Sequence, residues 1–89
     1  VEQYLNGEIT WAQMSGLSME QAYAIAELGY NLLTQGRLQD AETIFVGLVE
    51  MNPQDGYFRG VLGSVWARQG KTDLALESFN YAIKLGSQD

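Results

Sequence analysis

The chain repeats part of its own sequence at a spacing of 34 residues. The segment 32–45 reads LLTQGRLQDAETIF, and the segment 66–79 reads WARQGKTDLALESF. One register aligns six identical pairs: Leu28 with Leu62, Gly29 with Gly63, Gln35 with Gln69, Gly36 with Gly70, Ala41 with Ala75, and Phe45 with Phe79. Because a period of this length is typical of units that stack on one another, we expect an array of similar units.

The first unit has the pattern of two helices joined by a glycine turn. Ser18 followed by Gln21 predicts a capping box that begins the first helix. Gly36 ends that helix, as glycine in a left-handed C-terminal position does. A second helix follows and is ended by NPQDG, residues 52–56, which contains the only proline of the chain. The unit is therefore a helical hairpin.

The second unit repeats this pattern. It predicts helices at about residues 55–69 and 73–85, with a turn at 70–71, and Gly86 is expected to end the last helix. The sequence thus predicts an all-α fold in which two hairpins, at about residues 22–55 and 56–89, form a domain over residues 18–89.

Eight recurring residues are expected to build this fold and to do no chemistry. Glycine within a helix costs up to about 1 kcal/mol relative to alanine, so its recurrence indicates that a partner helix approaches closely. The two alanines are expected to face the mid-helix glycines, and the two phenylalanines to fill the wedge between hairpins. The set comprises Gly29, Gly36, Ala41, Phe45, Gly63, Gly70, Ala75 and Phe79.

Composition argues against several classes of function. The chain has no cysteine and no histidine, which removes cysteine nucleophiles, thiolate metal sites, and the commonest general base and metal ligand. The net charge of -6 disfavours nucleic acid as a partner. The apolar runs are too short to span a membrane. The carboxylates of the second helices, such as Glu42, are interpreted as a solvated face, so we expect neither an enzyme nor a cofactor or metal site.

Residues 1–17 form a separate segment in this interpretation. Six apolar residues could give a short amphipathic helix, although Asn6-Gly7 interrupts the pattern. An array of two hairpins leaves apolar end faces that need cover. We therefore expect this segment to pack on the first hairpin or on a second copy of the chain, as a capping or dimerisation element. The apolar residues are Tyr4, Leu5, Ile9, Trp11, Ala12 and Met14.

The period, the turn glycines and Pro53 resemble the tetratricopeptide repeat, over residues 21–85. The resemblance implies a short right-handed solenoid whose first helices line a concave groove. It departs from the usual pattern at the start of the first helices, where Ile25 and Arg59 replace an aromatic residue.

On this fold, one stripe of each first helix is expected to face the groove. Tyrosines on such a stripe add apolar area at low entropic cost and keep a hydroxyl for a backbone partner. We therefore expect the groove to bind an extended peptide of a client protein. The alternative is that the tyrosines merely cover the core or contact the segment before residue 18, and that Arg68 is a solvated charge. The expected groove residues are Tyr23, Ala26, Tyr30, Leu33, Tyr57, Ser64 and Arg68.

A narrower resemblance is to the bacterial type III secretion chaperones of translocator proteins. It is carried by the pattern Tyr-x-x-Ala-x-x-x-Tyr at residues 23–30, and by Asp73-Leu74-Ala75 before the aromatic residues Phe79 and Tyr81. The resemblance implies that Tyr23 and Tyr30 line the client groove. It also implies dimerisation through the N-terminal region. A cytoplasmic location is expected because no segment is predicted to span a membrane and the N-terminus lacks a signal-peptide pattern.

Two alternatives stay open at this stage. Those chaperones carry a third repeat and this sequence holds two, so the sequence is either truncated or that of a shorter relative. The protein is either such a chaperone or a structural adaptor in a larger assembly, which would use its end or convex faces.

Overall fold

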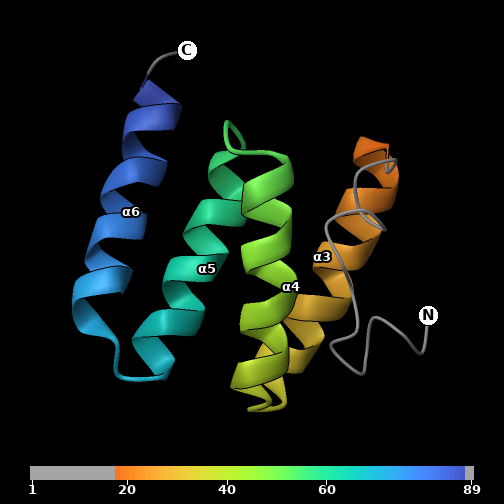
Figure 1. The fold of residues 1–89 in the computed structure, drawn as a ribbon, viewed down its shortest axis with the longest axis horizontal. Coiled ribbons are helices and arrows are strands. Elements are labelled where there is room, and N and C mark those ends of the chain that lie inside the picture. Colours follow the sequence, from red (N-terminus) through yellow and green to blue (C-terminus); the bar gives the residue numbers. More distant parts are fainter. Residues whose placement is uncertain (1–17, 88–89) are drawn as a thin grey trace.

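The computed structural model describes residues 18–87, which form four α-helices and no strand. They are α3 (Met19–Thr34), α4 (Leu38–Met51), α5 (Gly56–Arg68) and α6 (Thr72–Ser87). Helix α3 packs on α4, α4 on α5, and α5 on α6, and α3 also contacts α5 (Figure 1). The predicted all-α fold of two stacked hairpins is confirmed. The expectations for residues 1–17 lie outside the described residues.

Helices α3 and α5 begin close to the predicted residues because side chains cap them. In the capping box of α3, the Gln21 backbone N–H donates to Ser18 Oγ at 3.2 Å, and the Ser18 backbone N–H donates to Gln21 Oε1 at 3.0 Å. Helix α5 is capped by Asp55, whose Oδ1 accepts from the backbone N–H groups of Tyr57 and Phe58.

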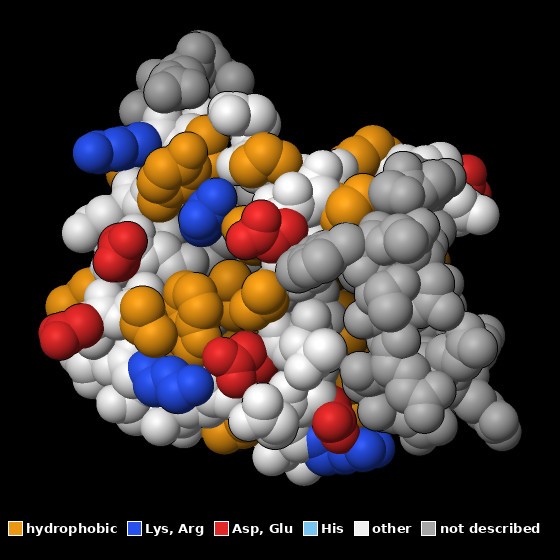
Figure 2. All heavy atoms as spheres, in the orientation of Figure 1, with side chains coloured by type: hydrophobic (Ala, Val, Ile, Leu, Met, Phe, Trp, Pro, Cys, Tyr) orange, Lys and Arg blue, Asp and Glu red, His pale blue; other side chains and the backbone are white. Residues whose placement is uncertain are grey.

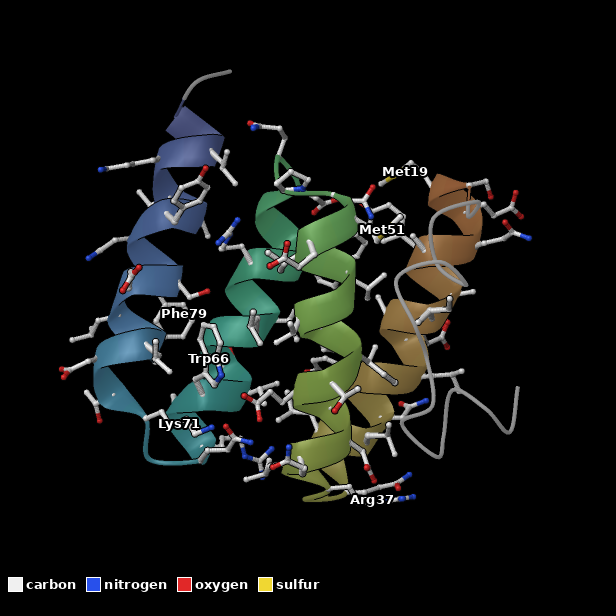
Figure 3. All side chains as sticks on the ribbon, in the orientation of Figure 1. Met19, Arg37, Met51, Trp66, Lys71 and Phe79 are labelled. Atoms are coloured by element: carbon white, nitrogen blue, oxygen red, sulfur yellow. The ribbon has the colours of Figure 1, made fainter. Side chains whose placement is uncertain are left out.

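Both hairpin turns use the same left-handed glycine. Gly36 and Gly70 each have φ of +81°, which favours glycine over any residue with a Cβ. After each glycine the chain folds back onto its helix: Arg37 N–H donates to the Leu32 carbonyl at 2.9 Å, and Lys71 N–H to the Trp66 carbonyl at 2.8 Å. Figure 3 shows Arg37 and Lys71 at the same end of the molecule, away from Met19 and Met51.

The mid-helix glycines face phenylalanine rings, and not the alanines that the sequence pattern suggested. A Cβ on Gly29 would lie 2.7 Å from Phe45 Cε2, and one on Gly63 would lie 2.8 Å from Phe79 Cε1. Each ring therefore lies against the glycine of its own hairpin. The expectation that the alanines meet the glycines is wrong because the larger ring fills that space.

The core lies mainly where the first hairpin meets α5. Its largest fully buried side chains come from α4 and α5: Phe45, Ile44, Leu48, Phe58 and Val65. On α6, within the described residues, only Ala75 and Ser78 are buried, and Phe79 is partly exposed. Helix α6 also continues through Gly86 to Ser87, so the expected stop at Gly86 is wrong. Gly86 does not have the positive φ that ends α3 and α5.

Candidate peptide-binding site

Three tyrosines and one glutamate line an open pocket between α3 and α5. Tyr23, Glu27 and Tyr30 stand at i, i+4 and i+7 of α3 and so share one face of that helix, and Tyr57 comes from the first turn of α5. The pocket has a volume of about 410 Å³. The Tyr23, Tyr30 and Tyr57 side chains are 44%, 48% and 50% exposed, so their rings are available to a partner.

Two of the three rings, those of Tyr23 and Tyr57, are held by packing, and Tyr23 is also held by one hydrogen bond. The Tyr23 ring lies 5.1 Å from the buried Phe58 ring and 6.0 Å from the Tyr57 ring, measured between centroids in tilted arrangements. The Tyr23 hydroxyl donates to Asp55 Oδ2 at 2.5 Å. This hydrogen bond, more than the desolvation and charge effects beside it, raises the pKa of Tyr23 above its ordinary value of 10.0. Tyr23 therefore links α3 to the residue that caps α5.

Two of the predicted groove residues are part of the core instead. Ala26 is 1% exposed and Leu33 is 4% exposed, because both belong to the stripe of α3 that packs against its neighbouring helices. The expectation that they face the groove is wrong. The buried face of α3 is wider than the prediction assumed. Of the four predicted groove residues on α3, only Tyr23 and Tyr30 are exposed.

The remaining two predicted residues are tied to backbone carbonyls. Ser64 is partly buried, and its hydroxyl donates to the Gly60 carbonyl of its own helix at 3.4 Å. Arg68 Nη1 donates to the Leu33 carbonyl at 3.0 Å, near the C-terminus of α3. A cation there also complements the helix dipole. Arg68 therefore joins the two hairpins, which was expected neither of a groove residue nor of a solvated charge.

Sequence reasoning missed Glu27 as a member of the site. Its spacing could have indicated that it belongs to the site, since it lies four residues after Tyr23 and three before Tyr30 on one helix face. Asp55 was assigned only to the start of a helix, whereas one of its carboxylate oxygens caps α5 and the other accepts from Tyr23.

Glu42 is not a solvated carboxylate, contrary to the sequence expectation. Its oxygens accept from Trp66 Nε1 at 3.0 Å, Gln69 Nε2 at 3.1 Å and Lys71 Nζ at 3.4 Å, so it connects α4 to the second hairpin. Burial raises the pKa of Glu42, but the hydrogen bonds from Trp66 and Gln69 and the charge of Lys71 outweigh burial. The net result is a pKa below the ordinary value of 4.5.

The outer side of α6 is a second exposed surface. Its apolar residues include Leu76 and Ile83, which are seven residues apart and share one face of the helix, whereas Leu74 lines a smaller hollow against α5, where Arg59 stacks over the Tyr81 ring at 4.2 Å. Figure 2 shows hydrophobic side chains gathered between single charged groups on the face that carries α4 and α6. Val49 on α4 is 8% exposed, whereas its repeat equivalent Ile83 is 68% exposed. The difference arises because α5 covers α4, and no described helix covers the outer side of α6.

Neither surface has the features of a metal site or a membrane segment. Within residues 18–87, no group of three or more acidic side chains is placed to hold a metal ion. No helix in this part of the chain is long and apolar enough to cross a membrane.

Comparison with known proteins gives one family and two relatives. The model of the tetratricopeptide repeat family matches residues 26–89. The low calcium response locus protein H of Yersinia pestis is 28% identical over 81 residues, as is the protein of that name from Yersinia pseudotuberculosis. The match covers 91% of this chain but 48% of each relative, so the chain spans about half of their length.

Proposed function

Because the chain belongs to the tetratricopeptide repeat family, whose repeats mediate protein interactions, we propose that it binds an extended peptide of a client protein. The peptide lies along the face that carries Tyr23, Tyr30 and Tyr57. The module does no chemistry of its own and holds its client non-covalently.

The observation that carries this proposal is the pocket between α3 and α5. Three half-exposed tyrosine rings around one open hollow give shallow apolar contacts, with hydroxyls at their edges. Such amphipathic rings suit side chains and backbone of an extended segment, and they lose little entropy on binding. The link from Tyr23 to Asp55 holds part of this surface in place before a peptide arrives.

The narrower proposal is that the protein is a cytoplasmic bacterial chaperone for type III secretion translocator proteins. It is supported by the tyrosine pattern of α3 and by the 28% identity to the low calcium response locus proteins. A homodimer formed through residues 1–17 belongs to the same proposal. Sedimentation that shows a strict monomer over the micromolar range would remove the dimer from it.

The test is to change two groove tyrosines at once. The chain with Tyr23→Ala and Tyr30→Ala should lose capture of its client from the native host, measured by co-purification and mass spectrometry. Far-UV circular dichroism should show unchanged helicity. Tyr81→Ala is the matched control, since Tyr81 is similarly exposed at 42% but lies on α6. If the double variant captures the same protein as wild type, the groove is not the binding surface.

A structural adaptor is a second candidate, favoured by the exposed apolar side of α6. In that case Ile83→Asp, on the outer side of α6, should abolish association while the tyrosine variants leave it intact. Phe79→Asp is a poorer test, because the Phe79 ring fills the space beside Gly63 and its loss would disturb the hairpin itself.

A further inference from the structure

The pocket between α3 and α5 combines aromatic rings with a carboxylate that has no partner within the described part of the chain. Its lining is Tyr23, Tyr30 and Tyr57 together with Glu27, and it contains no basic residue. Asp55, which accepts from Tyr23, adds a second carboxylate beside the rings. Faces of aromatic rings attract cations, and a carboxylate at the same site adds direct charge attraction.

The basic residues of the protein lie outside this pocket. The chain has five, against eleven acidic residues. Arg37 pairs with Asp40, Arg59 stacks over Tyr81, and Lys71 pairs with Glu42. Arg68 donates to the Leu33 carbonyl, and Lys84 is on α6. None of these residues lines the pocket, which is therefore a negatively charged aromatic surface.

We propose that this pocket is a subsite for a cationic side chain, lysine or arginine, of the bound peptide. The ammonium or guanidinium group lies against the tyrosine rings and pairs with Glu27, and the aliphatic stem of the side chain packs on the ring surfaces. The inference rests on the proposed function, since it assigns one position of the peptide that the groove would hold. It states a specificity that apolar contacts with tyrosine alone would not give.

A selection experiment tests the subsite without a known client. Heptapeptides with random sequence, displayed on phage, are selected on the immobilised 89-residue chain at physiological salt, so that general attraction to the net charge of -6 is screened. Wild type is compared with Glu27→Gln, with Glu50→Gln, and with the Tyr23→Ala and Tyr30→Ala double variant. Glu50 is the matched control, because it is an exposed glutamate on α4 outside the pocket.

Wild type and Glu50→Gln should select peptides with lysine or arginine at one fixed position, and Glu27→Gln should lose that preference. A selected peptide whose basic residue is replaced by norleucine should bind wild type about fivefold to tenfold more weakly by calorimetry. This second measurement needs no protein variant.

Two results would overturn the subsite while leaving peptide binding in place. One is a consensus that depends on the tyrosines but has no basic position. The other is equal affinity of the lysine and norleucine peptides. Selection that gives no consensus, or the same consensus on wild type and on the double tyrosine variant, would refute both the subsite and the proposed groove.

Discussion

At the scale of single residues, three glycines within helices have different surroundings although the sequence makes them look alike. A Cβ on Gly29 would meet Phe45 and Ile44 at 2.7 and 2.9 Å, and one on Gly63 would meet the Phe79 ring. A Cβ on Gly60 would have no atom of residues 18–87 within 4 Å beyond its own helix backbone and chain neighbours. Close packing therefore explains Gly29 and Gly63, whereas Gly60 has no steric reason to lack a side chain.

Gly29→Ala and Gly60→Ala should consequently change stability in opposite directions. Gly29→Ala should lower the free energy of unfolding by about 1–3 kcal/mol, because overpacking outweighs the better helix propensity of alanine. Gly60→Ala should raise it by about 0.5–1 kcal/mol, because only the propensity changes. Urea denaturation followed by circular dichroism measures both. Equal shifts of the same sign would show that the Phe45 ring does not constrain Gly29.

Glu42 gives a prediction about pH. Since its pKa is lower in the folded chain than its ordinary 4.5, it stabilises the fold above that value, and the contribution is lost as the pH falls through the folded pKa. Glu42→Gln should therefore flatten the decline of unfolding free energy between about pH 5 and pH 3 relative to wild type. Denaturant titrations across this range provide the measurement, with Glu50→Gln as the control. Parallel curves for wild type and Glu42→Gln would contradict the assignment.

At the scale of helices, the joint between α3 and α5 depends on the two oxygens of one carboxylate. Asp55 Oδ1 accepts from the first backbone N–H groups of α5, and Oδ2 accepts from the Tyr23 hydroxyl on α3. Helix capping and the arrangement of the candidate groove are therefore coupled through Asp55.

A double-mutant cycle on Tyr23→Phe and Asp55→Ala should reveal this coupling. Tyr23→Phe alone should cost about 0.5–1 kcal/mol, because Tyr23 is partly exposed and water replaces part of the lost hydrogen bond. Asp55→Ala should cost about 1–2 kcal/mol, since it removes the cap of α5 as well. The double variant should be less destabilised than the sum of the two. Strict additivity in urea denaturation would indicate that the two side chains do not interact.

The helices could be predicted from the sequence more completely than the contacts between them. The Ser18 capping box, the turn glycines and the break at 52–56 are local signals, and all four helices end within a few residues of their predicted bounds. The backbone hydrogen bonds that close the turns after α3 and α5 join residues that are neighbours in the sequence. Gly86 has the same residue type as Gly36 but not its conformation, so residue type alone did not determine the end of α6.

Predictions of side-chain surroundings were less successful because they depend on residues far away in the sequence. The helical period correctly brought Tyr23 and Tyr30 to one face, but it could not show that Ala26 and Leu33 are covered by neighbouring helices. Likewise, nothing near Glu42 in the sequence indicates that Trp66 and Gln69 donate to it.

At the scale of the whole molecule, the two hairpins repeat in sequence but not in burial. The described buried cluster draws on α3, α4 and α5 and includes no residue of α6. Phe45 is 0% exposed, whereas its repeat equivalent Phe79 is partly exposed beside Gly63. The first hairpin is covered by the second, so equivalent residues should contribute unequally to stability.

Phe45→Ala should lower the free energy of unfolding by about 3–5 kcal/mol, because it opens a cavity in the shared core. Phe79→Ala should cost about 1–2 kcal/mol, since part of the ring is already in contact with solvent. Denaturation should show the difference, and native-state hydrogen exchange should show where it acts. Phe79→Ala should speed exchange mainly in α6, whereas Phe45→Ala should speed it in α3, α4 and α5 as well.

Equal losses of stability, with exchange raised evenly over α3–α6 in both variants, would mean that the outer side of α6 is covered in solution. Since no other partner is present in these measurements, that result would indicate that a second copy of the chain covers α6.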